Sequence, residues 1–326
     1  MNRFRTKTRP REPDKGNRAS MHRRRERKSS MSRRIVGAMM ATVVSGMECV
    51  GQLPPEADPP YIPTSLAVLD VMLEMASVAS GDTVYDLGSG DGRIVIRAAE
   101  RGARGVGTEY DLELVERSRA NADSAGVGES VEFVHGDVFE ADVRSATVVT
   151  LYLGAEFNRR LRPRLLEQLR PGSRIVSHGF HMGDWEPDSV RNVGTGAARA
   201  TLYAWVVPAD VGGFWSIVIE GRETTVLEFD QSFQKIDGSL GRASRTVPIA
   251  AGEITGDSVE FEAVLAEGRG RGVFRFEGRL DGGRLAGVAR GPDGGALAWH
   301  AVRFTDPSRS PEWRDAPDRF PPDGMP

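Results

Sequence analysis

A glycine-rich turn is the strongest chemical signal in the sequence. The residues VYDLGSGDGR, at positions 84–93, follow a short apolar run and precede a run with helical spacing, which is the context that a ligand-binding turn needs. Glycines there let the chain bend sharply and let a ligand approach the backbone more closely than a Cβ would permit. We therefore interpret Gly88, Ser89 and Gly90 as binding residues, the alternative being a turn without a ligand.

The spacing within this turn selects the ligand. A dinucleotide site requires G-x-G-x-x-G, whereas the order here is G-x-G-x-G and Arg93 stands where the third dinucleotide glycine would be. Asp86, two residues before the first glycine, would repel a pyrophosphate but suits the cationic ammonium of a methionine moiety. The pattern therefore favours S-adenosylmethionine over a dinucleotide.

Two further acids follow the next expected strands. Glu109 lies 23 residues after Asp86, and an acid there can accept hydrogen bonds from both ribose hydroxyls. Asp137 is placed to contact an adenine amino group, with Val138 or Phe139 against the ring, although it is equally suited to be the N-cap of a following helix. Because the carboxyl ends of parallel strands line one crevice, we expect all three acids to share a site.

Alternating strands and helices must position these residues. The order is typical of a mostly parallel, Rossmann-like α/β sheet with helices on both faces. Between 178 and 208 there is room for only two short strands, so we expect an antiparallel hairpin to end the sheet. The expected helices are 65–80, 92–101, 112–125 and 157–169, and the expected strands are 83–87, 105–108, 131–135, 146–153, 174–177 and 201–207.

The hydrophobic pattern changes after Pro208. Seven or eight short runs alternate apolar and polar residues without an intervening helix, which predicts a small antiparallel barrel or sandwich. We interpret its large aromatic residues as core, although they are also compatible with a cup for an apolar ligand or a protein partner. These aromatic residues are Trp215, Phe229, Phe233, Phe274, Phe276 and Trp299.

Charge is distributed unevenly along the chain. Residues 1–34 hold 14 Lys and Arg against three acids, whereas the rest holds 29 basic and 43 acidic residues. The acidic body gives no electrostatic support to a nucleic-acid substrate. The single cysteine, Cys49, excludes an intramolecular disulfide.

An uncharged stretch follows the basic segment. Residues 35–47 come directly after two arginines and are too few to span a bilayer as a helix, but they suit a secretory signal segment. We therefore favour an exported protein over a cytoplasmic one, the alternative structure being a basic arm followed by a buried helix. The expected organisation is a basic leader at 1–51, a cofactor-binding domain at 52–208, an all-β domain at 209–305 and a disordered tail at 306–326.

These motifs resemble those of class I S-adenosylmethionine-dependent methyltransferases. More narrowly, PYIPT at 60–64, YDLGSGDGR at 85–93 and VSHGF at 176–180 are similar to the protein-lysine methyltransferases of the adenine nucleotide translocase and the ATP synthase c subunit and their bacterial relatives. The resemblance covers roughly residues 58–207. It implies that the three acids and the glycine turn bind the cofactor, with Tyr61 and Thr64 closing over it.

Transfer of an activated methyl group requires a nucleophile held in line behind it. For a lysine acceptor the protein must also favour the neutral amine. Tyr152, after the fourth strand, is a candidate to orient the amine, and His178, after the fifth, is a candidate base; each is otherwise a structural side chain.

The fourth strand bears on the choice of acceptor. It lacks the Asn/Asp-Pro-Pro-aromatic signature of adenine and glutamine N-methyltransferases. The scattered histidines indicate no metal site. We expect protein-lysine methylation; the alternatives are a small-molecule or lipid methyltransferase and an inert cofactor-binding envelope protein that acts through its β domain.

Overall fold

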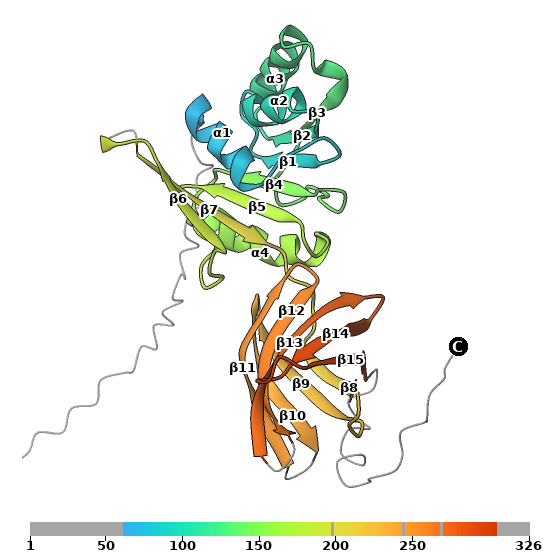
Figure 1. The fold of residues 1–326 in the computed structure, drawn as a ribbon. Helices are drawn as coiled ribbons and strands as arrows, with labels where there is room; N and C mark the ends of the chain where they lie inside the picture. The colour runs from blue at the N-terminus through green and yellow to red at the C-terminus, as the bar shows by residue number, and fades with distance from the viewer. Residues whose placement is uncertain (1–60, 197–198, 243–244, 268–269, 305–326) are drawn as a thin grey trace, which may run out of the picture. The chain divides into compact units, whose positions relative to one another are not determined.

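The computed structural model describes residues 61–304 except 197–198, 243–244 and 268–269. The signal-like segment and the proline-rich tail lie outside the described residues, so export and the proposed domain limits stay predictions. The sheet and the barrel shown in Figure 1 belong to one compact unit that begins at residue 57. None of the described helices is long and apolar enough to cross a membrane.

A seven-stranded sheet forms the first part of this unit, in the order β3-β2-β1-β4-β5-β7-β6. Its first five strands in the chain run parallel, and β7 and β6 are antiparallel, as the sequence predicts. The helices are α1 (Leu66–Met75), α2 (Arg93–Glu100), α3 (Leu112–Ser124) and α4 (Ala155–Gln168), with a 3₁₀ turn at Gly128–Ser130. The strands are β1 (Thr83–Leu87), β2 (Arg104–Glu109), β3 (Val131–His135), β4 (Val148–Leu151), β5 (Arg174–His178), β6 (Ser189–Val193) and β7 (Ala200–Val206).

Successive residues of the central strands face opposite sides of the sheet. Val148 of β4 and Val176 of β5 pack with α1 and α2 on one side. Val149 and Ile175, one residue away in each strand, pack with α4 on the other side. Both faces of the sheet are therefore covered, which explains why β4 is buried along its whole length and confirms the predicted fold class.

The first helix is shorter than its apolar pattern predicts. It ends at Met75, and Ser77 adopts a φ of 50°, a left-handed conformation that a helix cannot contain. At the other end, the Ser65 side chain accepts a hydrogen bond from the Val68 amide at 3.4 Å, which is N-capping.

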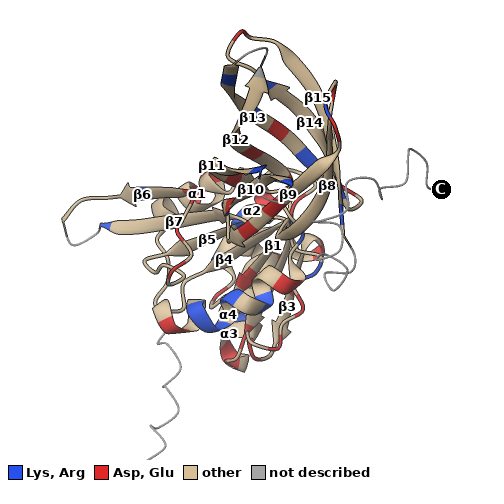
Figure 2. Ribbon diagram, turned by 90° about the horizontal axis from the view of Figure 1, so that it is seen from below, with Lys and Arg blue, Asp and Glu red and all other residues tan. Residues whose placement is uncertain are grey.

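Eight strands close into an antiparallel barrel after the sheet. They are β8 (Gly213–Ile219), β9 (Thr225–Ser232), β10 (Lys235–Arg242), β11 (Arg245–Thr255), β12 (Ser258–Glu267), β13 (Gly270–Asp281), β14 (Arg284–Arg290) and β15 (Ala296–Arg303). Figure 2 shows acidic and basic residues interspersed along β12 and β13, where Arg275 Nη2 lies 2.6 Å from Glu260 Oε2.

Aromatic side chains fill the barrel core. Phe261 and Phe276 are stacked with centroids 4.5 Å apart, and Trp299 meets both rings edge-on. Five of the six predicted core aromatics belong to this cluster. The prediction is wrong for Phe233, which instead packs against the hydrophobic cluster of the sheet.

Candidate functional site

The candidate site lies where the strand order of the sheet reverses. β1 has β2 on one side and β4 on the other, and ligands of open α/β sheets bind at the carboxyl ends of strands at such a switch point. Asp86 of β1 is paired in register with Gly107 of β2 and Thr150 of β4. The chain thus brings the glycine turn after β1 next to the end of β4.

Asp86 is a buried carboxyl group with one side-chain partner. Its side chain is 3% exposed, and Thr150 Oγ1 donates to its Oδ1 at 2.7 Å. Burial, with smaller contributions from the charges of Glu109 and Asp91, raises the pKa of Asp86 to about 7. A cation bound beside this carboxyl would favour its ionised form.

Two glycines of the turn, Gly88 and Gly90, have no room for a side chain. Gly88 and Gly90 have φ values of 79° and 55°. A Cβ on Gly88 would lie 2.5 Å from Leu153 Cδ2, and one on Gly90 would lie 2.5 Å from Tyr61 Cε2. Tyr61, predicted to close over the cofactor, therefore lies against the turn itself.

Ser89 supplies an unused polar atom in this turn. Its hydroxyl oxygen is buried and has no hydrogen-bond partner among the described residues, and buried polar atoms of this kind ordinarily have one. A narrow glycine turn, a buried carboxyl group and an unpartnered hydroxyl fit a small polar ligand that approaches the backbone. The residues present therefore fit S-adenosylmethionine.

Glu109 organises the turn through main-chain hydrogen bonds. Its Oε2 accepts from the Gly90 amide at 2.8 Å, and its Oε1 accepts from the amides of Tyr110 and Asp111. A carboxylate offers about four lone-pair positions, so capacity for about one further donor remains. Ribose binding by Glu109 stays a prediction, with the added finding that this residue shapes the glycine turn.

Arg93 fixes the segment that precedes α1, a role that the sequence analysis missed. Its guanidinium forms an ion pair with Asp91 at 2.7 Å and donates to the Thr64 carbonyl oxygen at 2.8 Å. Burial alone would raise the pKa of Asp91, but hydrogen bonding and charge from Arg93 hold it below its usual value. The arginine in place of a third dinucleotide glycine is the sequence signal for this role.

Thr64, Tyr152 and His178 come together on the β4–β5 side of the turn. Thr64 Oγ1 lies 3.1 Å from His178 Nδ1, and the Tyr152 and His178 rings are stacked with centroids 3.9 Å apart. Phe180 continues the stack, 6.0 Å from Tyr152. Burial lowers the pKa of His178, so its imidazole is predominantly neutral near pH 7.

Asn158 of α4 supports this stack and was also missed. Its Nδ2 donates to Ser177 Oγ at 2.9 Å and to the Phe180 carbonyl oxygen at 3.1 Å. The residue is fully buried. Its position between Phe157 and Leu161 on the apolar face of a helix was the sequence signal, because a buried amide requires partners.

Asp137 and Val138 occupy different environments. Asp137 is exposed, and its Oδ1 accepts from the Phe139 amide at 2.8 Å. This is a local turn rather than a helix N-cap, because no helix begins there. Val138 is buried in the same cluster as Leu87 and Leu153, which places it near the glycine turn, whereas adenine contact by Asp137 stays a prediction.

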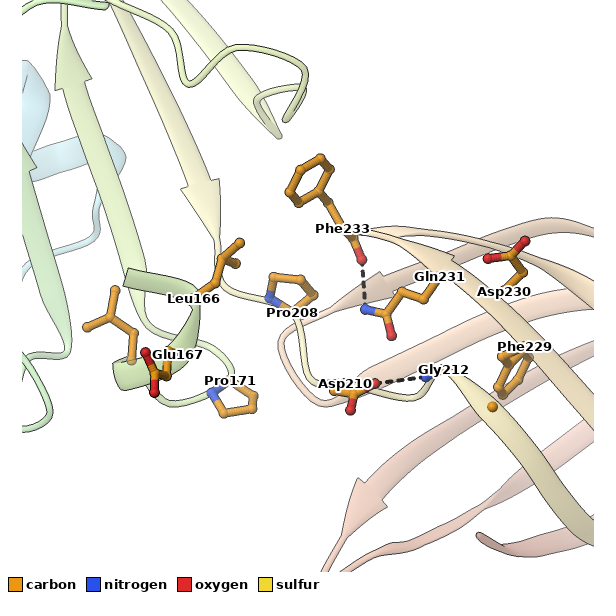
Figure 3. Close-up of a pocket in the computed structure, with 12 residues that line it drawn as sticks. Leu166, Glu167, Pro171, Pro208, Asp210, Gly212, Phe229, Asp230, Gln231 and Phe233 are labelled. Atoms are coloured by element: carbon orange, nitrogen blue, oxygen red, sulfur yellow. Dashed lines mark hydrogen bonds between the residues drawn. The ribbon is translucent and has the colours of Figure 1, made fainter. Parts of the chain in front are cut away.

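A separate groove of about 630 Å³ lies between the end of α4 and strands β8 and β9 (Figure 3). Its lining includes Leu166, Pro208 and Phe229 and none of the predicted site residues. Among the residues that the structure describes, no cluster of three or more His, Cys, Asp or Glu side chains is arranged to hold a metal ion.

Comparisons with known proteins agree with this geometry. The family described as the ANTKMT methyltransferase domain matches residues 86–189. A protein-lysine N-methyltransferase of Saccharolobus islandicus is 42% identical over 150 residues, which are 45% of this chain and 93% of that protein. The mouse adenine nucleotide translocase lysine N-methyltransferase is 34% identical over 44% of this chain.

The coverage of these relatives differs. The chain spans 62% of the mouse enzyme and 60% of the human ATP synthase c-subunit lysine N-methyltransferase. A solved Salinibacter ruber structure, titled an RNA methyltransferase in complex with S-adenosyl-L-homocysteine, shares 55% identity over 46% of this chain and 96% of that one, with a TM-score of 0.43. With 42% identity over nearly all of the Saccharolobus enzyme, this chain belongs to the family of S-adenosylmethionine-dependent protein-lysine N-methyltransferases.

Proposed function

We propose that this protein transfers a methyl group from S-adenosylmethionine to the Nζ of a lysine side chain in a protein substrate. The observation that carries the proposal is the pairing of Tyr152 with His178 at the carboxyl ends of β4 and β5, beside the glycine turn. This pair is where a nucleophile would meet the cofactor at a sheet switch point. Relatives that act on protein lysines support the choice of acceptor.

The cofactor, when bound, supplies a methyl group on a positively charged sulfur. The glycine turn and Glu109 would give the cofactor a narrow cradle, and Asp86, when ionised, would favour the cationic ammonium of its methionine moiety. The remaining task of the protein is to hold the acceptor amine in line and to keep it neutral.

His178 is the proposed acceptor of the amine proton. We assign the tautomer in which the Nδ1 hydrogen is donated to Thr64 Oγ1 over the 3.1 Å contact, which leaves a lone pair on Nε2. Within the described part of the chain, Nε2 has no hydrogen-bond partner. The lowered pKa keeps this nitrogen unprotonated near neutral pH. We assign Tyr152 to orienting the amine, since its ring is held in place between His178 and Phe180.

Methyl-group labelling tests the proposal directly. Purified protein is incubated with methyl-tritiated S-adenosylmethionine and a lysine-rich protein mixture, and in parallel with the same mixture after its lysines have been blocked by acetylation. We expect label on the untreated proteins, recovered as methylated lysine after acid hydrolysis, and a large loss of label after blocking.

The same assay includes the competing acceptor classes. Total RNA and a lipid extract are offered in separate reactions. Label that accumulates on RNA or lipid, or protein label that survives lysine blocking, would contradict the proposal. The acidic charge of residues 35–326 argues against RNA, because phosphate-rich acceptors are attracted by basic surfaces.

A further inference from the structure

The turn between β9 and β10 has an unfavourable backbone conformation. Phe233 adopts a φ of 53°, a left-handed conformation that is unfavourable for a residue with a Cβ. Gln231 braces the turn, because its Nε2 donates to the Phe233 carbonyl oxygen at 2.7 Å (Figure 3). Strain of this kind persists where surrounding contacts determine the geometry.

The side chains of Phe233 and Gln234 make contacts with the sheet. The Phe233 ring is stacked on Trp185 with centroids 5.6 Å apart and an interplanar angle of 13°. The Arg162 guanidinium lies 5.0 Å from the same ring. Gln234 is 4% exposed, and its Nε2 donates to the Glu186 carbonyl oxygen at 2.7 Å.

Trp185 and Glu186 belong to one segment, 179–188, which continues directly from His178, whereas Arg162 belongs to α4. Near its start, Phe180 is stacked on Tyr152 and its carbonyl oxygen accepts from Asn158. In its middle, the Met182 carbonyl oxygen accepts from Arg162 Nη1 at 2.7 Å. The segment is therefore held between α4 and the barrel turn, with the aromatic stack at its beginning.

We propose that the Phe233–Gln234 turn of the barrel positions the methyl-acceptor side of the site by holding segment 179–188, so that Phe180, Tyr152 and His178 keep their stacked arrangement. The proposal rests on the proposed function of Tyr152 and His178. It gives the barrel a role in the reaction without a ligand of its own. Gln234 and Phe233 act through the segment and do not touch the reacting atoms.

Phe233→Gly is the decisive variant. Glycine adopts the left-handed conformation without strain, so the substitution keeps the turn and removes the ring. Ala251→Gly is the matched control, because Ala251 is an exposed barrel residue with a φ of 49°. Phe233→Tyr, which keeps the ring, is the conservative variant, and Gln234→Ala tests the second contact.

Two measurements separate positioning from general stability. In steady-state assays with a protein or peptide acceptor, we expect kcat/KM for the acceptor to fall about 10- to 100-fold in Phe233→Gly, since small misplacements near a reacting centre have effects of this size. We expect the Kd for S-adenosylmethionine, measured by calorimetry, to stay within about twofold. Phe233→Tyr and Ala251→Gly should both behave as wild type.

A measurement without any acceptor makes the outcome independent of the proposed function. Loss of the Phe233 and Gln234 contacts should speed hydrogen exchange of the backbone amides in segment 179–188. It should also raise the pKa of the His178 imidazole, followed by NMR, toward its ordinary value. If the wild-type protein methylates no lysine, the proposed function fails and these two signals still decide the positioning claim. The positioning claim would be overturned if hydrogen exchange and the His178 pKa were unchanged in both Phe233→Gly and Gln234→Ala. It would also be overturned if exchange in 179–188 were faster but the acceptor kinetics stayed those of the wild type.

Discussion

At the scale of single residues, Asp86 shows how a binding group can oppose stability. The carboxyl group is buried at the end of β1 with Thr150 as its only side-chain partner among the described residues. Its pKa is raised to about 7, so between about pH 4 and pH 7 the folded protein retains a proton that the unfolded chain has lost. By linkage, the free energy of unfolding decreases as pH rises through this window.

Asp86→Asn should therefore stabilise the ligand-free protein at alkaline pH. The amide keeps the shape of the carboxyl group and can still accept from Thr150, but it has no charge to bury. We expect the variant to have the higher Tm at pH 8 and the two Tm values to converge near pH 4. Circular dichroism melts at both pH values test this, and a lower Tm for the variant at pH 8 would contradict it.

The same carboxyl group predicts a pH-dependent affinity. If the cationic cofactor requires ionised Asp86, its affinity rises up to tenfold per pH unit below about pH 7 and levels off above it. Calorimetric titration between pH 5.5 and 8.5 should show this rise, with proton release on binding near pH 6. In Asp86→Asn, affinity should be lower at pH 8 and nearly independent of pH; a pH-dependent variant would point to another group.

The proposed role of His178 predicts a change in kcat and no change in cofactor binding. His178→Ala should lower kcat about 10²- to 10⁴-fold, the usual size of a general-base contribution, with an unchanged Kd for S-adenosylmethionine. Because its pKa is lowered by burial, the acidic limb of the wild-type pH–kcat profile should lie below pH 6.5 and disappear in the variant. His181→Ala is the matched control, since His181 is exposed and bonds the nearby Gly183 amide. Equal loss in both variants would exclude a specific role for His178.

At the scale of elements, the sequence predicts the regular parts of the fold and misses contacts between distant segments. Strands 83–87 and 131–135 match the structure because apolar runs and turn residues are local signals. The predicted seven or eight barrel strands agree with the eight observed, although glycines interrupt the alternation within β10 and β11. One of these, Gly238, is required where a Cβ would lie 1.9 Å from the Glu228 carbonyl oxygen.

The candidate site shows the same division. The motif spacing identifies the glycine turn, Glu109 and His178, whereas the contact of Thr64 with His178 joins residues 114 positions apart. No local pattern encodes such a pairing. The sequence likewise places Phe233 in the barrel core, because an apolar residue next to a strand ordinarily faces the core of its own domain.

The glycine turn gives the prediction that belongs to this scale. Gly90→Ala forces a left-handed alanine and a clash with Tyr61 at 2.5 Å. Gly126→Ala also forces a left-handed alanine, at φ 72°, but its Cβ would have no atom of the described residues within 4 Å. Both should lose about 1–2 kcal/mol of stability in urea unfolding, whereas only Gly90→Ala should lose cofactor affinity, by tenfold or more. Equal cofactor affinity in the two variants would mean that the turn does not form the cofactor site.

At the scale of the whole molecule, two cores are joined through a small number of contacts. The barrel core contains residues of β8–β15, and the sheet has its own clusters on both faces. Besides the Phe233–Gln234 turn, Gly256 between β11 and β12 lies close to Gly172 before β5, where a Cβ added to Gly256 would be 3.2 Å from the Gly172 Cα. Cores that share so few residues are expected to unfold as separate cooperative units.

Differential scanning calorimetry should therefore show two transitions that respond to different changes. S-adenosylmethionine at 100 times its Kd should stabilise the sheet by about 2.7 kcal/mol and leave the barrel transition in place. Phe276→Ala, which removes a fully buried ring stacked on Phe261, should destabilise the barrel by about 3–5 kcal/mol and leave cofactor affinity unchanged. A single transition that moves with both changes would show that the contacts between barrel and sheet carry more energy than their number implies. In that case we expect Phe233→Gly, which weakens the contacts between barrel and sheet, to show two separate unfolding transitions.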